Sequence, residues 1–71
     1  MSIIEFTKRI EDLFEDVSLE PTSDFRANDE FDSLIGYSIL VTIEDIFGVR
    51  MSVQDFLRCK TVEDLFHAIN G

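Results

Sequence analysis

Four segments of the chain carry apolar residues at helical spacing, and three of them begin with the same capping signal. In each signal a serine or threonine stands three residues before an acid, so that each side chain can accept a hydrogen bond from the other residue's backbone. The pairs are Ser2 and Glu5, Ser52 and Asp55, and Thr61 and Asp64. With 71 residues, the chain is expected to form one all-α domain, residues 1–71. We predict a small four-helix bundle with three longer helices and one short helix.

The first expected helix spans residues 3–16, and residues 17–32 form a long loop after it. The loop is rich in acids, contains Pro21, and is expected to be held to the core by Leu19 and Phe25. Asp32 is a suitable N-cap for a second helix over residues 33–47, and Gly48 marks its end.

The apolar positions define the faces that these helices should bury. The second helix is expected to bury Leu34, Tyr37, Leu40, Ile43 and Phe47, with Ile39 and Ile46 widening the stripe. The short third helix should carry Val53, Phe56 and Leu57, and the fourth Val62, Leu65, Phe66 and Ile69.

The charge balance excludes several classes of partner. The net charge is −9, from 15 acidic and 6 basic residues. Such a surface repels nucleic acid and anionic membranes, and it attracts basic patches on proteins. No apolar run approaches membrane-spanning length, so no membrane insertion is expected. The single cysteine, Cys59, and the absence of a signal-peptide pattern favour a cytoplasmic location. We also expect a monomer.

Ser33 is the residue on which a function is most readily placed. It follows the long loop at the predicted N-terminus of the second helix, where unpaired N–H groups and partial positive charge favour an anion. A phosphodiester built on an exposed Ser33 hydroxyl would lie against that helix end. From spacing alone, however, the plainer interpretation is favoured: Ser33 is simply the first residue of a capped helix.

Three motifs in order give the chain a family resemblance. Asp32-Ser33-Leu34 resembles the Asp-Ser-Leu motif of acyl carrier proteins, and the run 43–48 (IEDIFG) resembles the close of that family's second helix. The run 60–65 (KTVEDL) resembles the opening of its last helix. The resemblance implies that a phosphopantetheinyl transferase attaches 4′-phosphopantetheine from coenzyme A to Ser33. The arm would then hold an acyl group as a thioester, and the protein would be a carrier and not an enzyme.

The resemblance also assigns roles around Ser33. Asp32 would cap the helix and help bind the transferase's metal ion, and Leu34 would help dock partners. The second helix would meet acyl-activating, acyltransferase or ketosynthase enzymes through basic patches on those enzymes. The implied partner-facing residues are Ile35, Ser38, Val41, Glu44 and Asp45. For the two acids an ordinary solvated helix face is the alternative.

The family further implies an acyl cavity between the second and third helices. Its lining would include Ile39, Leu40, Ile43, Phe56 and Leu65. Core packing explains the same five residues without any cargo, so both interpretations stay open.

Some residues depart from the housekeeping fatty-acid carriers. Phe31 before the motif resembles stand-alone carriers of specialised pathways, such as surface polysaccharide or secondary-metabolite assembly. Ile35 replaces an expected acid, and Gly36 costs helix stability. These features leave one alternative, a carrier-like interaction module that has lost its arm.

No other chemistry has support in the sequence. Cys59 and His67 form no zinc pattern, and Cys59 is expected to be a buried filler. The loop acids and amide resemble a calcium loop only faintly, because they lack the EF-hand register. Those loop residues are Asp24, Asn28, Asp29 and Asp32. We therefore predict no metal site.

Overall fold

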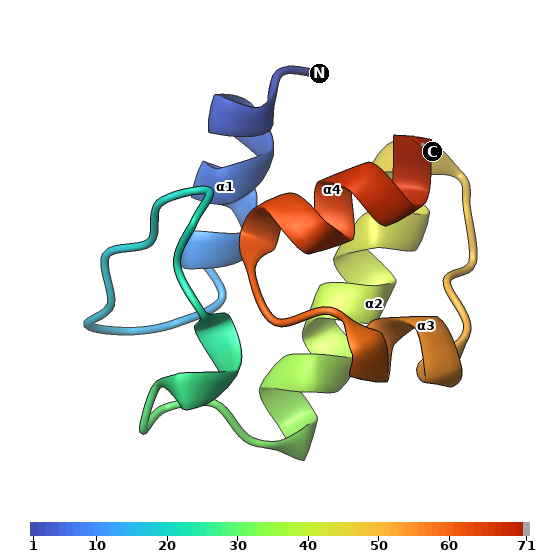
Figure 1. Ribbon diagram of the computed structural model, residues 1–71. Helices are drawn as coiled ribbons and strands as arrows, with labels where there is room; N and C mark the ends of the chain where they lie inside the picture. The colour runs from blue at the N-terminus through green and yellow to red at the C-terminus, as the bar shows by residue number, and fades with distance from the viewer. Residues whose placement is uncertain (71) are drawn as a thin grey trace.

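The computed structural model describes residues 1–70, and these form four α-helices and one short 3₁₀ turn (Figure 1). The elements are α1 (Ile3–Glu11), η1 (Phe25–Ala27), α2 (Ser33–Phe47), α3 (Val53–Arg58) and α4 (Val62–Asn70). The described residues contain no strand, only an isolated antiparallel bridge between Asp24 and Thr61. The all-α prediction, with three longer helices and one short one, is confirmed.

The predicted capping signals do open the helices. At α1 the Glu5 N–H donates to Ser2 Oγ at 3.2 Å, and the Ser2 N–H donates to Glu5 Oε1 at 3.3 Å. At α4 the Asp64 N–H donates to Thr61 Oγ1 at 3.1 Å, and the Thr61 N–H returns a bond of 3.1 Å to Asp64 Oδ2. The serine before α3 accepts a backbone bond in the same way. These bonds satisfy N–H groups that a helix start leaves without an intrahelical partner.

The predicted end of the first helix was wrong, because α1 stops at Glu11 and does not continue to residue 16. The N–H groups of Leu13 and Phe14 donate to carbonyls three residues back at 3.0 Å, so the chain tightens there. The next two backbone N–H groups donate to the Glu30 carboxylate at 2.8 and 3.0 Å. Phe14 is still buried, so the apolar spacing continued past the true helix end.

The predicted face of α2 was also wrong in part. Leu34 and Tyr37 were expected in the core, but they are 72% and 66% exposed. The buried positions of α2 are Gly36, Ile39 and Ile43. Because α2 is apolar on most sides, the apolar spacing predicted where the helix lies along the chain but not which side of it faces the core.

The same error affects α3. Phe56 is buried as predicted, but Val53 and Leu57 are 62% and 63% exposed. A helix of only six residues turns one side chain inward and leaves its neighbours in solvent. Both exposed residues lie beside α2, at the site described below.

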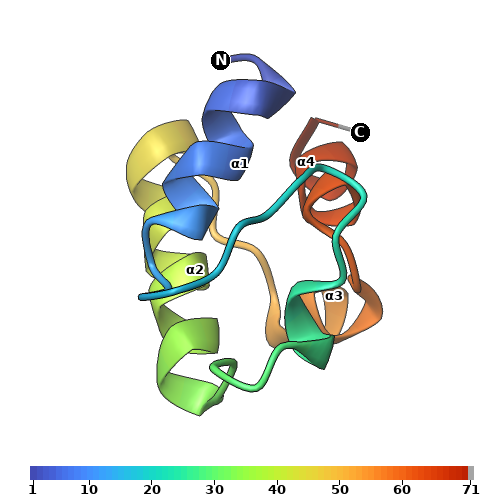
Figure 2. The same cartoon turned by 90° about the vertical axis from the view of Figure 1, so that its left-hand side faces the viewer.

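The core lies between the helices and the long connection after α1, which crosses from α1 to α4 and η1 (Figure 2). α1 packs against both α4 and α2. The core residues are Phe6, Ile10, Phe14, Phe25, Ile39, Ile43, Phe56, Cys59, Val62 and Leu65. Phe25 is fully buried and Leu19 packs on the core, as predicted. No helix among residues 1–70 has the length and apolarity to cross a membrane.

Backbone bonds fix the end of the loop against the start of α4. The Phe25 N–H donates to the Lys60 carbonyl at 3.2 Å, and the Val62 N–H donates to the Ser23 carbonyl at 3.3 Å. The Glu63 N–H donates to the Pro21 carbonyl at 2.8 Å. The segment that leads into Ser33 is therefore anchored on one side of the bundle.

Candidate functional site

The N-terminus of α2 presents Ser33 to solvent as its first residue. Asp32 is the N-cap, as predicted: its Oδ1 accepts the Ile35 N–H at 2.8 Å, and its carbonyl accepts the Gly36 N–H at 3.0 Å. The N–H groups of Ser33 and Leu34 precede any intrahelical acceptor. The cap thus satisfies part of the helix end and leaves the part next to the Ser33 hydroxyl open.

The first turn of α2 differs in charge from those of the other three helices. α1, α3 and α4 each carry an acid there, whereas α2 has none and places Ile35 in that turn. An acid in the first turn offsets the positive end of the helix dipole. Apart from the Asp32 cap, this end of α2 is left able to stabilise a further anion by about 0.3–1 kcal/mol.

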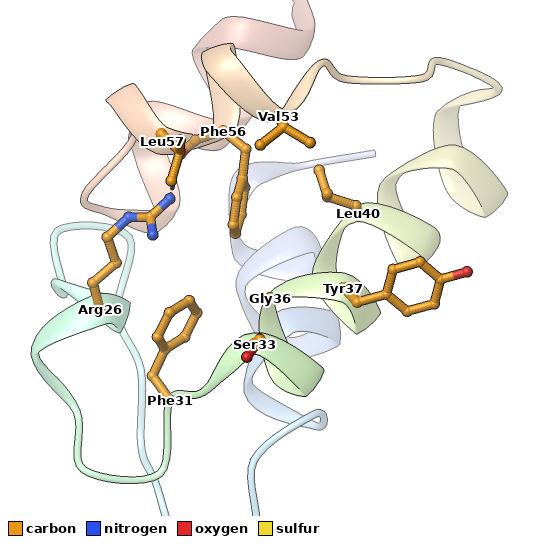
Figure 3. Close-up of a pocket in the computed structure, with 9 residues that line it drawn as sticks. All are labelled: Arg26, Phe31, Ser33, Gly36, Tyr37, Leu40, Val53, Phe56 and Leu57. Carbon is orange, nitrogen blue, oxygen red and sulfur yellow. Dashed lines mark hydrogen bonds between the residues drawn. The ribbon is translucent and has the colours of Figure 1, made fainter.

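A pocket of about 340 Å³ lies between α2 and α3 beside Ser33 (Figure 3). α2 contributes Ser33, Gly36, Tyr37 and Leu40, α3 contributes Val53, Phe56 and Leu57, and the loop contributes Arg26 and Phe31. Three of the exposed apolar side chains, Tyr37 of α2 and Val53 and Leu57 of α3, are therefore walls of this pocket. Its surroundings are mainly aromatic and aliphatic, as is usual for a site that binds a small organic group.

Gly36 sets how closely the aromatic rings approach α2. A Cβ on Gly36 would lie 3.4 Å from Phe56 Cε2 and 3.5 Å from Phe31 Cζ. The missing side chain leaves both rings in contact with the helix and keeps space open beside Ser33. The glycine has a place in the packing that its helix propensity alone does not indicate.

Arg26 is the site residue that sequence reasoning missed. Its Nε donates to the Cys59 carbonyl at 2.7 Å, and its Nη2 donates to the Phe56 carbonyl. Its Cζ lies 4.5 Å from the Phe56 ring centroid and 5.5 Å from that of Phe31, both within cation–π range. The guanidinium thereby caps the end of α3 and joins the loop to it. One feature of the sequence could have drawn attention to Arg26, because it is the only basic residue between Arg9 and Arg50.

The predicted partner-facing residues of α2 differ in exposure. Val41, Glu44 and Asp45 are exposed, whereas Ile35 and Ser38 are half-buried. Glu44 already has a partner in the chain, because Arg50 Nη2 lies 3.3 Å from its Oε2. This hydrogen bond raises the pKa of Arg50. Both side chains are solvated, so the pair contributes little to stability.

A second pocket of about 350 Å³ lies further along α2. Tyr37, Leu40 and Val53 line both pockets, so the two are neighbours along the α2–α3 surface. The Glu44–Arg50 pair is at the far one.

The five residues assigned to an acyl cavity share one hydrophobic core, but only two of them line the pocket. Leu40 and Phe56 line the pocket beside Ser33. Ile39, Ile43 and Leu65 are fully buried in the core and do not line it. The open space at this site is therefore at the surface between α2 and α3, above a closed core.

The comparison with family models decides the identity. Residues 2–69 match the model of the phosphopantetheine attachment site. The chain belongs to this family. It is a phosphopantetheine carrier protein, and its cofactor is covalently attached 4′-phosphopantetheine. A search of curated proteins found no match.

The carrier offers the arm a suitable residue. The arm attaches through a phosphate to a serine oxygen, so the site needs an exposed hydroxyl in surroundings that tolerate negative charge. Ser33 is exposed at a helix N-terminus, and it borders an apolar pocket. Among residues 1–70 no hydrogen bond engages its hydroxyl, unlike Ser2, Ser23 and Ser52, whose Oγ atoms accept backbone N–H groups.

The structure also places the residues that were considered for metal binding or thiol chemistry. Cys59 is buried, its thiol donates to the Asp55 carbonyl at 3.4 Å, and burial raises its pKa. His67 is exposed on α4. In the loop, Asp24 caps η1 and Asn28 accepts the Glu30 N–H. Within residues 1–70 no three His, Cys, Asp or Glu side chains form a cluster that could hold a metal ion.

Proposed function

We propose that Ser33 is the attachment residue and that the carrier holds acyl groups as thioesters on its arm. The observation that carries this proposal is the position of the hydroxyl. Ser33 is exposed at the N-terminus of α2 and beside a pocket, and its hydroxyl makes no hydrogen bond within residues 1–70. Ser38 is half-buried within α2, and Ser18 lies in the loop away from any helix start.

The proposed transfer requires little of the carrier itself. The Ser33 oxygen forms a bond to the phosphorus of phosphopantetheine, while the bond from that phosphorus to adenosine bisphosphate in coenzyme A breaks. The hydroxyl proton passes to a base of the transferase. Asp32 holds the first turn in place through its bond to the Ile35 N–H, and Leu34 offers an exposed apolar contact to the transferase. Once attached, the arm supplies a thiol for thioester chemistry.

Partner enzymes are proposed to dock on α2. Val41, Glu44 and Asp45 form an exposed apolar and acidic surface on the helix that begins at Ser33. Basic patches on acyl-activating, acyltransferase or ketosynthase enzymes would complement it. We propose a non-catalytic, cytoplasmic, monomeric carrier that serves either fatty-acid synthesis or a specialised pathway.

Intact mass tests the attachment residue. Co-expression with a broad-specificity phosphopantetheinyl transferase should add the mass of one arm to the carrier. Ser33→Ala should abolish that addition, whereas the matched controls Ser18→Ala and Ser38→Ala should retain it. An addition that survives Ser33→Ala would refute the assignment, and no addition to the folded wild-type protein would favour the alternative, an unmodified interaction module.

A further inference from the structure

Arg26 is a half-buried cation without an anionic partner among residues 1–70. The chain has 15 acids. Two other basic residues do form ion pairs, Arg50 with Glu44 and Arg58 with Asp55, and both pairs lie on the surface. Arg26 instead contacts two carbonyls and three aromatic rings. A guanidinium in such surroundings has given up part of its water.

Arg26 lines the pocket beside Ser33 and has N–H donors that no group of residues 1–70 accepts from. A guanidinium has five N–H donors, and the Cys59 and Phe56 carbonyls take two of them. Figure 3 shows the side chain reaching from the loop toward α3, on the side of the pocket opposite Tyr37. The pocket therefore combines apolar walls with one cation that has hydrogen bonds left to donate.

This combination discriminates between classes of cargo. An alkyl chain that entered the pocket would displace water from the remaining Arg26 N–H groups and would offer them no hydrogen-bond acceptor, which is unfavourable. A carboxylate would accept from them, in the fork geometry that arginine favours. The overall charge of −9 disfavours a carboxylate near this protein, and among residues 1–70 Arg26 is the only basic residue that lines the pocket, so a carboxylate bound there gains its stabilisation from Arg26.

The space beneath the pocket favours a short group. Ile39 and Ile43 are fully buried, and Phe56 is almost so. A long alkyl chain would have to open this core before it could be hidden from water. A short chain with a polar end uses the 340 Å³ that is already open.

We propose that the pocket between α2 and α3 selects a short acyl group that ends in a carboxylate, and that Arg26 binds that carboxylate. The inference rests on the proposed carrier function. It assigns Arg26 to cargo recognition in addition to its place at the end of α3.

The test compares two arms on the wild-type carrier. Amide-linked pantetheine analogues bearing glutaryl or pentanoyl have the same number of carbons and differ only in the terminal carboxylate. We expect glutaryl to shift the Arg26 Nε–H resonance, relative to the unacylated arm, and to raise Tm by about 4 °C over pentanoyl. High salt should reduce the difference. Equal or larger effects of pentanoyl would overturn the proposal, as would an Arg26 resonance that neither cargo moves.

Variants separate recognition from folding. Arg26→Lys should keep part of the preference for glutaryl, and Arg26→Gln should lose it while intact mass still shows the arm. A preference that persists in Arg26→Gln would show that Arg26 is not the recognising residue. Failure of wild-type protein to accept any arm would count against the carrier function, and the wild-type cargo comparison stands even if both variants unfold.

Discussion

Gly36 gives a prediction whose sign follows from the packing. Glycine inside a helix is less stable than alanine by about 1 kcal/mol. A Cβ at Gly36 would lie 3.4 Å from Phe56 Cε2 and 3.5 Å from Phe31 Cζ, which are ordinary contact distances. No backbone strain opposes the change, because Gly48 is the only glycine of the described chain with positive φ. We therefore expect Gly36→Ala to stabilise the carrier by about 0.5–1 kcal/mol.

The same substitution at Gly48 is the matched control with the opposite sign. Gly48 ends α2 at φ 67°, a conformation that costs a residue with a Cβ about 1–2 kcal/mol. Nothing lies within 4 Å of a Cβ built there, so the cost comes from the backbone alone. The two alanine variants should move stability in opposite directions from the wild type.

Thermal and urea unfolding of the three proteins provides the assay. For a domain of this size, a change of 1 kcal/mol corresponds to a Tm shift of about 4–8 °C. Gly36→Val extends the test, because its extra methyl groups would press on the two rings and cost about 1–3 kcal/mol. Destabilisation by Gly36→Ala as large as that by Gly48→Ala would refute the packing described here.

Two further predictions concern charge. Reversing Asp45 to Lys should slow acyl loading by the cognate enzyme more at low salt than at high salt, whereas the control Asp12→Lys, at the C-cap of α1, should not. Equal slowing by both would show a net-charge effect only. The Lys60 and Thr61 N–H groups hold the pKa of Asp64 below its ordinary value. The ionised Asp64 carboxylate therefore stabilises the folded protein above the unfolded pKa of about 4, and this stabilisation is lost as pH falls through the lower folded pKa. The Tm difference between wild type and Asp64→Asn should shrink in that acid range, and a difference independent of pH, or matched by Asp29→Asn, would contradict this.

The helix starts were predictable from sequence because their determinants are local. The Ser2–Glu5 and Thr61–Asp64 pairs and the Asp32 cap act over three residues, and each forms the expected bond. The end of α2 was predictable in the same way, because Gly48 is a local signal. The end of α1 and the buried faces of the helices depend instead on distant residues. α1 ends early where the Glu30 carboxylate, far along the chain, takes the next backbone N–H groups. No pattern within the first helix contains that information.

For the candidate site, too, the local part was predictable from sequence and the part that depends on helix orientation was not. Its N-terminal half, Asp32 and Ser33, lies in one motif that local rules describe. Its other half depends on α2 turning Tyr37 outward and on α3 leaving Val53 and Leu57 exposed. The periodicity of two strongly apolar helices did not fix those rotations, so the predicted cavity residues divided between the pocket and the closed core.

The placement of charge connects the two halves of the site. The chain places acids in the first turns of three helices, and leaves that position apolar in the helix that begins at Ser33. It also leaves Arg26 without a carboxylate on another wall of the same pocket. The net charge of the protein is −9, and of the residues that the structure describes Arg26 is the only basic one that lines this pocket. Positive potential at these two points around one pocket would favour both the phosphate proposed at Ser33 and the anionic cargo proposed for the pocket.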